Sequence, residues 1–411
     1  AIAFFGLSLG AIASGALSNA RTAQILSTPH TLFVAHAIAR ALDLVNITSE
    51  VLTASPECFD ADLYFVIAPQ VFDRLPPGNK RICVQMEQSI SSRWFTAGYF
   101  DILRSSIAIL DYSEHNLEFL DEHGVGYPSA FHLPIGGIEN YQANTLSALH
   151  EKNIDILFYG DDKNPRRKQI LAALNGEFRI HVVNNLFGSE LENMIRQAKV
   201  VLNIHYYENS LLETTRIYEC ISLGTEIVSE TSLDQSEHPE LLGIVRFARA
   251  GNVEEIAAQL RAALANMRPD RTPEVASVIA TTQQRFNFML LRSLYGLNAI
   301  SFDKLDTTTI DVGNLGPKVA LSMPETVRRR ALFEESKLEG FRIFDGLRMT
   351  PGWKGCASSY KYLARRALQS GRERLLICED DVDLSETTPA QLEAVDRYLQ
   401  ANREHWDVFA G

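Results

Sequence analysis

Four cations follow the end of an apolar run near the middle of the chain: Lys163, Arg166, Arg167 and Lys168. The run itself, residues 154–160, has the continuous apolar character of a strand buried on both faces of a parallel sheet. Open α/β sheets bind ligands outside the carboxyl ends of their strands. The sequence therefore predicts that Gly160 and the three cations from Arg166 to Lys168 form a diphosphate-binding loop. The alternative is a solvated helix start, which a run of charges often is.

A second set of candidate residues lies in residues 212–229, which read as a helix that ends at Gly224 ahead of an apolar strand. Arg216 and Glu219 lie near one face of this helix, because residues three apart are neighbours on a helix surface. A guanidinium can bind phosphate oxygens in a bidentate way, and a carboxylate can accept hydrogen bonds from both ribose hydroxyls. These two side chains therefore predict a nucleoside diphosphate site. The alternative is a surface ion pair of little energy.

Further polar residues follow other predicted strands. His205 and Tyr206 come after the strand at residues 200–204 and either line a base or sugar pocket or form a buried aromatic edge. Glu87 comes after the strand at residues 81–86. It is a candidate general base, since an attacking hydroxyl must lose its proton, or else it caps a loop.

Carboxylates gather at the end of the last clear strand, where residues 374–378 run into Glu379, Asp380 and Asp381. Adjacent carboxylates repel one another unless a cation lies between them, and a hard divalent ion with oxygen ligands relieves that repulsion. The sequence therefore predicts an Mg²⁺ or Mn²⁺ site at this strand end, or else a solvated acidic turn.

Alternating strands and helices must position these residues. Apolar strands within residues 62–110 alternate with helical stretches, and a second alternation begins at residue 154. A polar segment at residues 303–316 precedes a third unit. The predicted fold class is α/β, with Rossmann-like domains in the first two of three units: residues 1–145, 146–300 and 301–411.

The composition is that of a globular protein. The 411 residues are 46% hydrophobic, enough for roughly two to three domains. The net charge of -12 argues against a general nucleic-acid binder. Five scattered cysteines without a CxxC pair or zinc spacing predict a reducing, cytoplasmic setting. We expect neither an integral membrane span nor export, because there is no long apolar run and no Lys or Arg precedes the mildly apolar stretch near the start.

The segment around Arg216 and Glu219 resembles the donor-binding helix of glycosyltransferases with the two-Rossmann-domain architecture called GT-B. The resemblance implies that Glu219 holds the donor ribose and Arg216 a phosphate, as in bacterial polysaccharide and spore-maturation type transferases, in which an Arg precedes the Glu by three. Many GT-B enzymes carry an earlier second Glu, but Leu211 stands at that position. Glu213 or Glu208 would then take its role.

Residues 84–88 and 111–116 resemble the N-terminal domain of the same transferases. The resemblance implies that the acceptor lies against the first unit and the nucleotide-sugar against the second. Glu87 and Arg216 would then be the catalytic residues. No metal or other cofactor is expected at this site.

The third unit resembles family 25 glycosyltransferases, the lipooligosaccharide and collagen-galactose type, which adopt the GT-A fold. The resemblance rests on the order of four short motifs: Arg328-Arg329-Arg330, Phe344-Asp345-Gly346, Gly355-Cys356 and Glu379-Asp380-Asp381. It implies that Glu379 and Asp381 are metal positions. Tyr360 departs from the usual His, and a GT-A domain normally continues well beyond the strand expected at residues 406–408, so the resemblance places the activity in residues 1–300.

Together these resemblances imply a glycosyltransferase that moves a sugar from a UDP-, GDP- or dTDP-sugar to a glycan or lipid-linked acceptor in bacterial surface polysaccharide synthesis. We expect no nucleic-acid partner, and a cytoplasmic protein associated peripherally with the inner face of the plasma membrane. Two alternatives stay open. One is a nucleotide-sugar epimerase or hydrolase with the same fold, and the other is a non-catalytic nucleotide- or glycan-binding scaffold.

Overall fold

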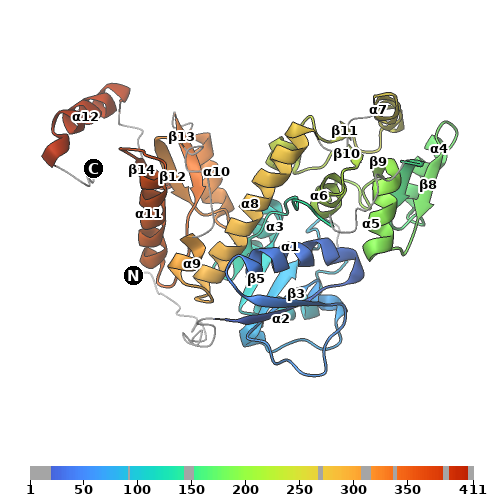
Figure 1. Ribbon diagram of the computed structural model, residues 1–411, viewed down its shortest axis with the longest axis horizontal. Helices are drawn as coiled ribbons and strands as arrows, with labels where there is room; N and C mark the ends of the chain where they lie inside the picture. Colours follow the sequence, from blue (N-terminus) through green and yellow to red (C-terminus); the bar gives the residue numbers. More distant parts are fainter. Residues whose placement is uncertain are drawn as a thin grey trace.

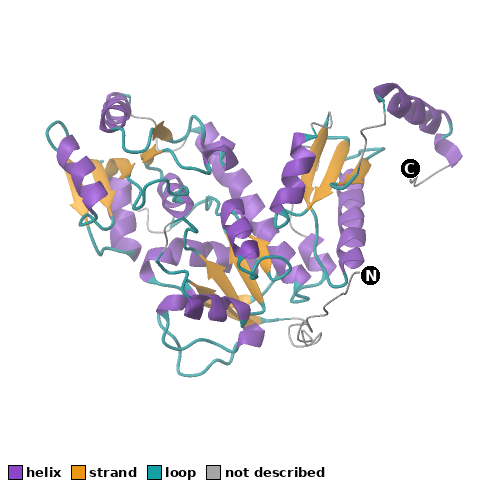
Figure 2. Ribbon diagram, turned by 180° about the vertical axis from the view of Figure 1, so that it is seen from behind, coloured by secondary structure: helices purple, strands orange, loops and turns teal. Residues whose placement is uncertain are grey.

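The structure, a computed structural model, contains three parallel β-sheets with helices packed on them (Figure 1). It describes residues 20–90, 93–142, 152–266, 272–306, 316–336, 340–382 and 388–405. The first unit lies between the other two, as the view from behind also shows (Figure 2).

The first unit is a six-stranded sheet with the strand order β2-β1-β3-β4-β5-β6. Its strands are β1 (Thr22–Leu26), β2 (Thr48–Leu52), β3 (Leu63–Ile67), β4 (Arg81–Gln85), β5 (Ala108–Asp111) and β6 (Ala130–His132). Its helices are α1 (Leu32–Asp43), α2 (Ala97–Arg104) and α3 (Glu114–Glu122). Every residue of β3 and β4 is buried, as expected for central strands covered on both faces.

The second unit is a five-stranded sheet with the order β11-β10-β9-β7-β8. Its strands are β7 (Ile154–Tyr159), β8 (Ile180–Val183), β9 (Ala198–Asn203), β10 (Glu226–Glu230) and β11 (Arg246–Ala248). Its helices are α4 (Pro165–Leu174), α5 (Gly188–Gln197), α6 (Thr214–Ser222) and α7 (Val253–Ala265). The strand order reverses between β7 and β9, which is where doubly wound folds bind ligands. The prediction of two Rossmann-like domains is confirmed.

The helix α8 (Pro273–Gly296) leaves the second unit and crosses the first, and it contacts α1 of the first unit and α6 of the second. The third unit follows it with a three-stranded sheet of order β13-β12-β14. Its elements are α9 (Phe302–Asp306), β12 (Lys318–Ser322), α10 (Val327–Glu335), β13 (Phe341–Asp345), α11 (Gly352–Gln369), β14 (Leu376–Glu379) and α12 (Pro389–Ala401). Its assignment to the GT-A fold stays a prediction, and the strand expected at residues 406–408 lies outside the described residues.

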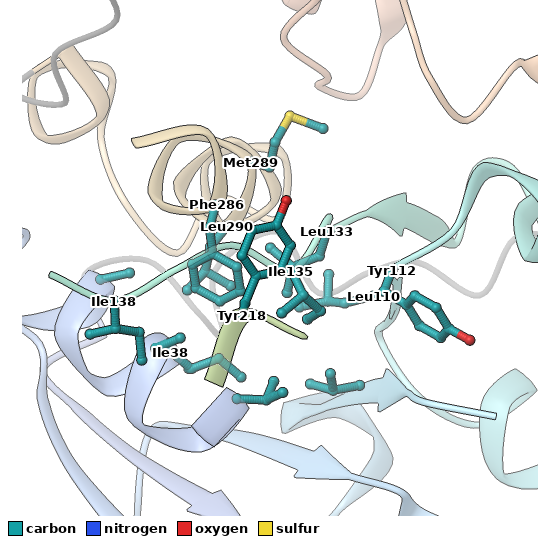
Figure 3. Close-up of a cluster of buried hydrophobic side chains, with 14 of the residues drawn as sticks. Ile38, Leu110, Tyr112, Leu133, Ile135, Ile138, Tyr218, Phe286, Met289 and Leu290 are labelled. Carbon is teal, nitrogen blue, oxygen red and sulfur yellow. The ribbon is translucent and has the colours of Figure 1, made fainter. Parts of the chain in front are cut away.

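One hydrophobic cluster runs through all three units. Figure 3 shows part of it, where side chains of α1, of α6 and α8 and of the segment after β6 meet: Ile38, Leu133, Ile135, Ile138, Tyr218, Phe286, Met289 and Leu290. The segment after β6 lies so close to α8 that a Cβ at Gly136 would come within 2.3 Å of the Thr282 carbonyl oxygen. The helix α8 therefore acts as a shared support for the first and second units.

A buried ionic cluster fastens the third unit to the first. The Arg292 guanidinium on α8 donates to both oxygens of Glu325, at 2.6 and 2.9 Å, and both side chains are inaccessible to solvent. The His132 amide at the end of β6 donates to the same carboxylate at 2.9 Å. Although burial opposes ionisation, Arg292 and Arg348 lower the pKa of Glu325 to about 2. The Glu325 carboxylate is therefore ionised, and Arg292, Arg348 and the His132 amide surround it.

Candidate functional site

A cleft with a cavity volume of about 520 Å³ lies between the carboxyl edges of the first two sheets. The first unit lines it with residues that follow β1, β3, β4 and β5, among them His30, Ala68, Glu87 and Tyr112. The second unit lines it with residues that follow β7 and β9 and with the start of α6: Gly160, Arg167, Tyr206, Glu213, Thr214, Thr215, Arg216 and Glu219. Candidate residues from both units thus share one cavity.

Two guanidiniums lie beside one another in this cleft. Arg167 donates to one oxygen of Glu213 at 3.2 Å, and Arg216 lies 3.1 Å from the other oxygen. Arg216 also donates to the Asn203 side chain at 2.8 Å, and Arg167 to the Ile204 carbonyl at 2.9 Å. Two cations on one anion leave a net positive charge, which suits a phosphate group.

Electrostatic interactions among Arg167, Glu213 and Arg216 keep Glu213 and Arg216 ionised. Burial opposes ionisation of Glu213, but Arg216 and Arg167 lower its pKa below the ordinary value. Burial likewise opposes the charge of Arg216, whose pKa is nevertheless raised by Glu213. The Arg216 guanidinium lies 4.6 Å from the Tyr159 ring centroid, a cation–π contact that further holds its position.

Gly160 provides the space between the two guanidiniums. Its φ of +124° is unfavourable for other residues, and a Cβ placed there would lie 3.3 Å from the nearest nitrogen of both Arg167 and Arg216. Any side chain would intrude at the point where the two cations converge. Close approach of a ligand to the backbone therefore requires glycine here.

We expect the Gly160→Ala variant to lose about 1–3 kcal/mol of stability from backbone strain and to bind a nucleoside diphosphate, the ligand that the sequence predicts, more weakly than the parent. Thermal unfolding and calorimetric titration with UDP measure the two effects. Gly176→Ala is the matched control, because a Cβ there meets only one carbonyl oxygen, at 3.9 Å. Equal effects of the two substitutions would contradict the proposed role of Gly160.

Glu219 also lines the cleft, near a second carboxylate that sequence reasoning missed. Burial, with the negative charge of Glu192 on α5, raises the pKa of Glu219 to about 8, although Arg216 opposes the shift. Glu192 also lines the cleft and accepts a hydrogen bond from the Tyr141 hydroxyl at 2.9 Å. The raised pKa favours the protonated form of Glu219, which can donate as well as accept a hydrogen bond.

The raised pKa predicts how stability depends on pH. The folded protein holds the Glu219 proton more tightly than the unfolded chain, so this stabilisation is complete below about pH 4.5 and is lost as the pH rises through about 8. We expect Glu219→Gln, which cannot ionise, to unfold at a higher temperature than the parent at pH 9 by a few degrees, roughly 2–4 °C per kcal/mol. The difference should shrink or reverse at pH 5. A pH-independent difference between the two proteins would contradict this prediction.

On the facing unit, Glu87 lines the cleft where β4 ends. Its carboxylate accepts a hydrogen bond from the Gln70 amide at 2.7 Å, and its carbonyl accepts one from Asn116 at 2.9 Å. Asp111, at the end of β5, is fully buried and accepts from Asn116 at 3.1 Å. Through Asn116, Asp111 helps to position the loop that carries Glu87. Glu87 lines the cavity, whereas Asp111 does not.

The two units touch beside the cleft. The Gln88 side-chain amide accepts from the Leu211 N–H at 3.0 Å and donates to the Leu211 carbonyl at 3.3 Å. Leu211, which stands where the resemblance to GT-B enzymes implies an earlier Glu, contributes its main chain to this contact between the first and second units. Gln88 lies in the segment 84–88 that the sequence analysis singles out, but no role is predicted for it there.

Four predicted donor-site residues do not line this cavity. Arg166 donates to both oxygens of Glu230, at 2.8 and 2.6 Å, and to the His205 carbonyl. His205 is buried, and its ring pairs with the Thr231 carbonyl at 3.2 Å. Lys168 is exposed on α4, one position beyond Arg167. Gly224, with φ +79°, ends α6 below the site.

The predicted metal residues lie apart, at the carboxyl edge of the third sheet. Arg329 donates to Asp380 at 2.5 Å and lies 3.1 Å from Asp381, while Glu379 accepts from the Cys356 thiol at 3.3 Å. Among the described residues, no group of three His, Cys, Asp or Glu side chains is arranged to hold a metal ion. In this arrangement a guanidinium lies against Asp380 and Asp381, and the metal site at Glu379 and Asp381 stays a prediction.

Comparisons with known proteins give partial matches. No protein-family model matches the chain. Two uncharacterized proteins of Acanthamoeba polyphaga mimivirus are similar to it, one 26% identical over 147 residues (33% of this chain, 45% of the viral protein) and one 31% identical over 131 residues (32% and 43%). The chain spans less than half the length of these relatives.

Solved structures with a similar fold include the following two proteins. One is AviGT4, a glycosyltransferase involved in avilamycin A biosynthesis, at 15% identity and a TM-score of 0.45, covering 67% of this chain and 98% of that one. The other is Anabaena HepE in complex with UDP and glucose, at 10% identity and a TM-score of 0.43, with coverage of 67% and 98%. In the part of the chain that the structure describes, no helix has the length and apolar character needed to cross a membrane.

Proposed function

We propose that the chain is a glycosyltransferase that uses a nucleotide-sugar bound in the cleft between its first two units. The observation that carries this proposal is the pair of guanidiniums, Arg167 and Arg216, that converge on Gly160 at the carboxyl edge of the second sheet. Glu87 of the first unit lines the same cavity. A site with cations on one wall and a carboxylate on the other suits transfer from a diphosphate donor to a hydroxyl acceptor.

The donor diphosphate would lie against Arg167, Arg216 and the first turn of α6. Thr214 and Thr215 begin this helix and line the cleft, so the positive end of the helix dipole lies beside the same space. Glu219, one turn further on, would bind a ribose hydroxyl. Tyr206, whose ring lies 5.3 Å from the Arg167 guanidinium, would flank the base or the sugar.

The reaction follows from these positions. The bond between the anomeric carbon and the diphosphate breaks, and its electron pair leaves with the nucleoside diphosphate, which Arg167 and Arg216 stabilise. The acceptor oxygen forms the new bond to the anomeric carbon, and its proton passes to Glu87. The two guanidiniums supply the positive charge for the leaving group, so we propose that this site needs no metal.

We infer the finer assignment from the sequence resemblance. The acceptor would be a glycan or a lipid-linked glycan of a bacterial surface polysaccharide, and the donor a UDP-, GDP- or dTDP-sugar. The protein would work in the cytoplasm, at the inner face of the plasma membrane. The acidic net charge of -12 favours such an acceptor over a nucleic acid.

A nucleotide screen followed by turnover assays tests the proposal. We expect UDP, GDP or dTDP to raise the unfolding temperature, since a ligand that binds the folded state stabilises it. We expect a UDP-sugar, or its GDP or dTDP counterpart, to release the nucleotide only when a glycan acceptor is present. Release without acceptor would indicate a hydrolase or epimerase, and binding without any turnover would indicate a scaffold.

A further inference from the structure

A second cavity lies between the first and third units, away from the nucleotide cleft. Its volume is about 750 Å³. The first unit contributes Ile107, which precedes β5, and Tyr127 to Ser129, which precede β6, so this wall is the amino edge of the first sheet. The third unit contributes residues at the carboxyl ends of β12, β13 and β14. The cleft and this cavity, here named the inter-unit pocket, therefore occupy opposite edges of one sheet.

Arg348 holds the first and third units together at one side of this pocket. Arg348 of the third unit donates to the Ala130 carbonyl at 2.5 Å and also to the Pro128 carbonyl. Its guanidinium lies 3.9 Å from the Phe131 ring centroid and 4.8 Å from that of Tyr127. With Glu325 held by Arg292 behind it, Arg348 fixes the first unit as one side of the inter-unit pocket. The cavity is thus a product of the way the two units dock.

The side chains of the inter-unit pocket combine exposed aromatic rings with carboxylates. Trp353, at the start of α11, is 67% exposed, and Tyr127 is 46% exposed, and both line the cavity. Glu379 and Asp380 lie at the end of β14, and Arg329 pairs with Asp380. Large rings left open to solvent inside a cavity are unusual, because such rings are normally buried on folding.

The charges that line the inter-unit pocket disfavour an anionic ligand. The Arg329 charge is engaged by Asp380 and Asp381, and the Arg348 charge by Glu325, so neither is offered alone to an anion. Glu379 adds a negative charge that would repel a diphosphate. The carboxylates accept hydrogen bonds from hydroxyl groups, and flat aromatic rings pack against the apolar faces of sugar rings. A neutral polyhydroxylated ligand fits both features.

We propose that the inter-unit pocket binds a neutral saccharide and that it holds a segment of glycan apart from the transfer site. Tyr127 and Trp353 pack on the sugar rings, and Glu379 accepts from their hydroxyls. The third unit thereby serves as a glycan-binding platform that is complete only when docked on the first unit. Saccharide binding at this pocket does not depend on the proposed transferase activity and is tested separately from it.

Saturation-transfer NMR on the full chain with lactose, maltose and chitobiose tests the proposal. We expect transfer to at least one of these neutral disaccharides, and a rise in its Kd of about tenfold or more in Trp353→Ala and in Tyr127→Ala, the usual effect of truncating an aromatic anchor. Tyr398→Ala is the matched control, since Tyr398 is an exposed aromatic residue (65%) on α12 that does not line the pocket. The Kd of Tyr398→Ala for the same disaccharide should equal that of the parent protein.

Four outcomes would overturn the proposal. The first is transfer to none of the disaccharides, and the second is an unchanged Kd in both aromatic variants. The third is loss of disaccharide binding in Arg216→Ala, which would place the saccharide in the cleft. Failure of UDP to bind, with disaccharide binding intact, would refute the proposed function and leave the inter-unit pocket standing. UDP binding that is lost in Trp353→Ala but kept in Arg216→Ala would make this pocket a nucleotide site instead.

Discussion

Replacement of Arg216 by alanine is expected to lower the turnover number for sugar transfer by about 10²–10³-fold, the usual loss when one preorganised charge at a developing anion is removed. Arg216 faces the cleft, and its partners Glu213 and Asn203 hold it in place before any ligand enters. The variant also leaves Glu213 with one cation in place of two. The stabilisation of the fold by UDP should therefore fall together with turnover.

Lys168→Ala is the matched control for this measurement. Lys168 is a cation of α4 that follows Arg167 in the sequence, but it is exposed and does not line the cleft. Steady-state kinetics with a nucleotide-sugar and a glycan acceptor should show parent-like turnover for Lys168→Ala. Equal losses in the two variants would mean that general charge, and not the Arg167–Glu213–Arg216 arrangement, governs donor binding.

Replacement of Glu325 by alanine is expected to destabilise the protein by about 3–5 kcal/mol, the cost of leaving a buried charge without its partner. Arg292 is completely buried and would lose its counter-ion. Because the pKa of Glu325 is lowered to about 2, its contribution to stability is present above the ordinary glutamate pKa and disappears as the pH falls from about 4.5 towards 2. Chemical denaturation at pH 7 and pH 3 measures both effects.

A matched exposed pair separates this effect from charge removal in general. Glu177 pairs with Arg261 on the surface, where the two side chains are 46% and 57% exposed. Glu177→Ala should leave stability nearly unchanged, since exposed ion pairs contribute little. The double variant Arg292→Met/Glu325→Leu should recover much of the stability that Glu325→Ala loses. A parent-like Glu325→Ala protein would show that the third unit docks by its apolar contacts alone.

The sequence predicts much of the fold because continuous apolar runs mark central parallel strands. The strands β3, β4, β7 and β10 follow such runs and fall where the sequence analysis expects them. It did not identify β2, because residues 48–52 are only partly buried at a sheet edge and carry no strong apolar pattern. The docking of the third unit could not be predicted either, since it depends on contacts such as His132 with Glu325, far apart in the sequence.

Part of the candidate site could likewise be predicted from the sequence, and part could not. Arg216, Glu219 and Gly160 were selected from local motifs, and the structure brings them to one cavity. The sequence could not decide between Arg167 and Lys168, because neighbouring residues on a helix point in directions about 100° apart, and the start of α4 decides which one faces the cleft. With Asn164 as the N-cap, that residue is Arg167. Glu192 had no local signal, because it reaches the cleft from a helix whose pattern is ordinary.

The contact between Gln88 and Leu211 bears on which residues position 211 can hold. Both hydrogen bonds go to main-chain atoms of Leu211, its N–H at 3.0 Å and its carbonyl at 3.3 Å. They therefore require no particular side chain, although proline would remove the N–H. The Leu211 side chain is buried, so packing and not the contact with Gln88 restricts the residue type at this position.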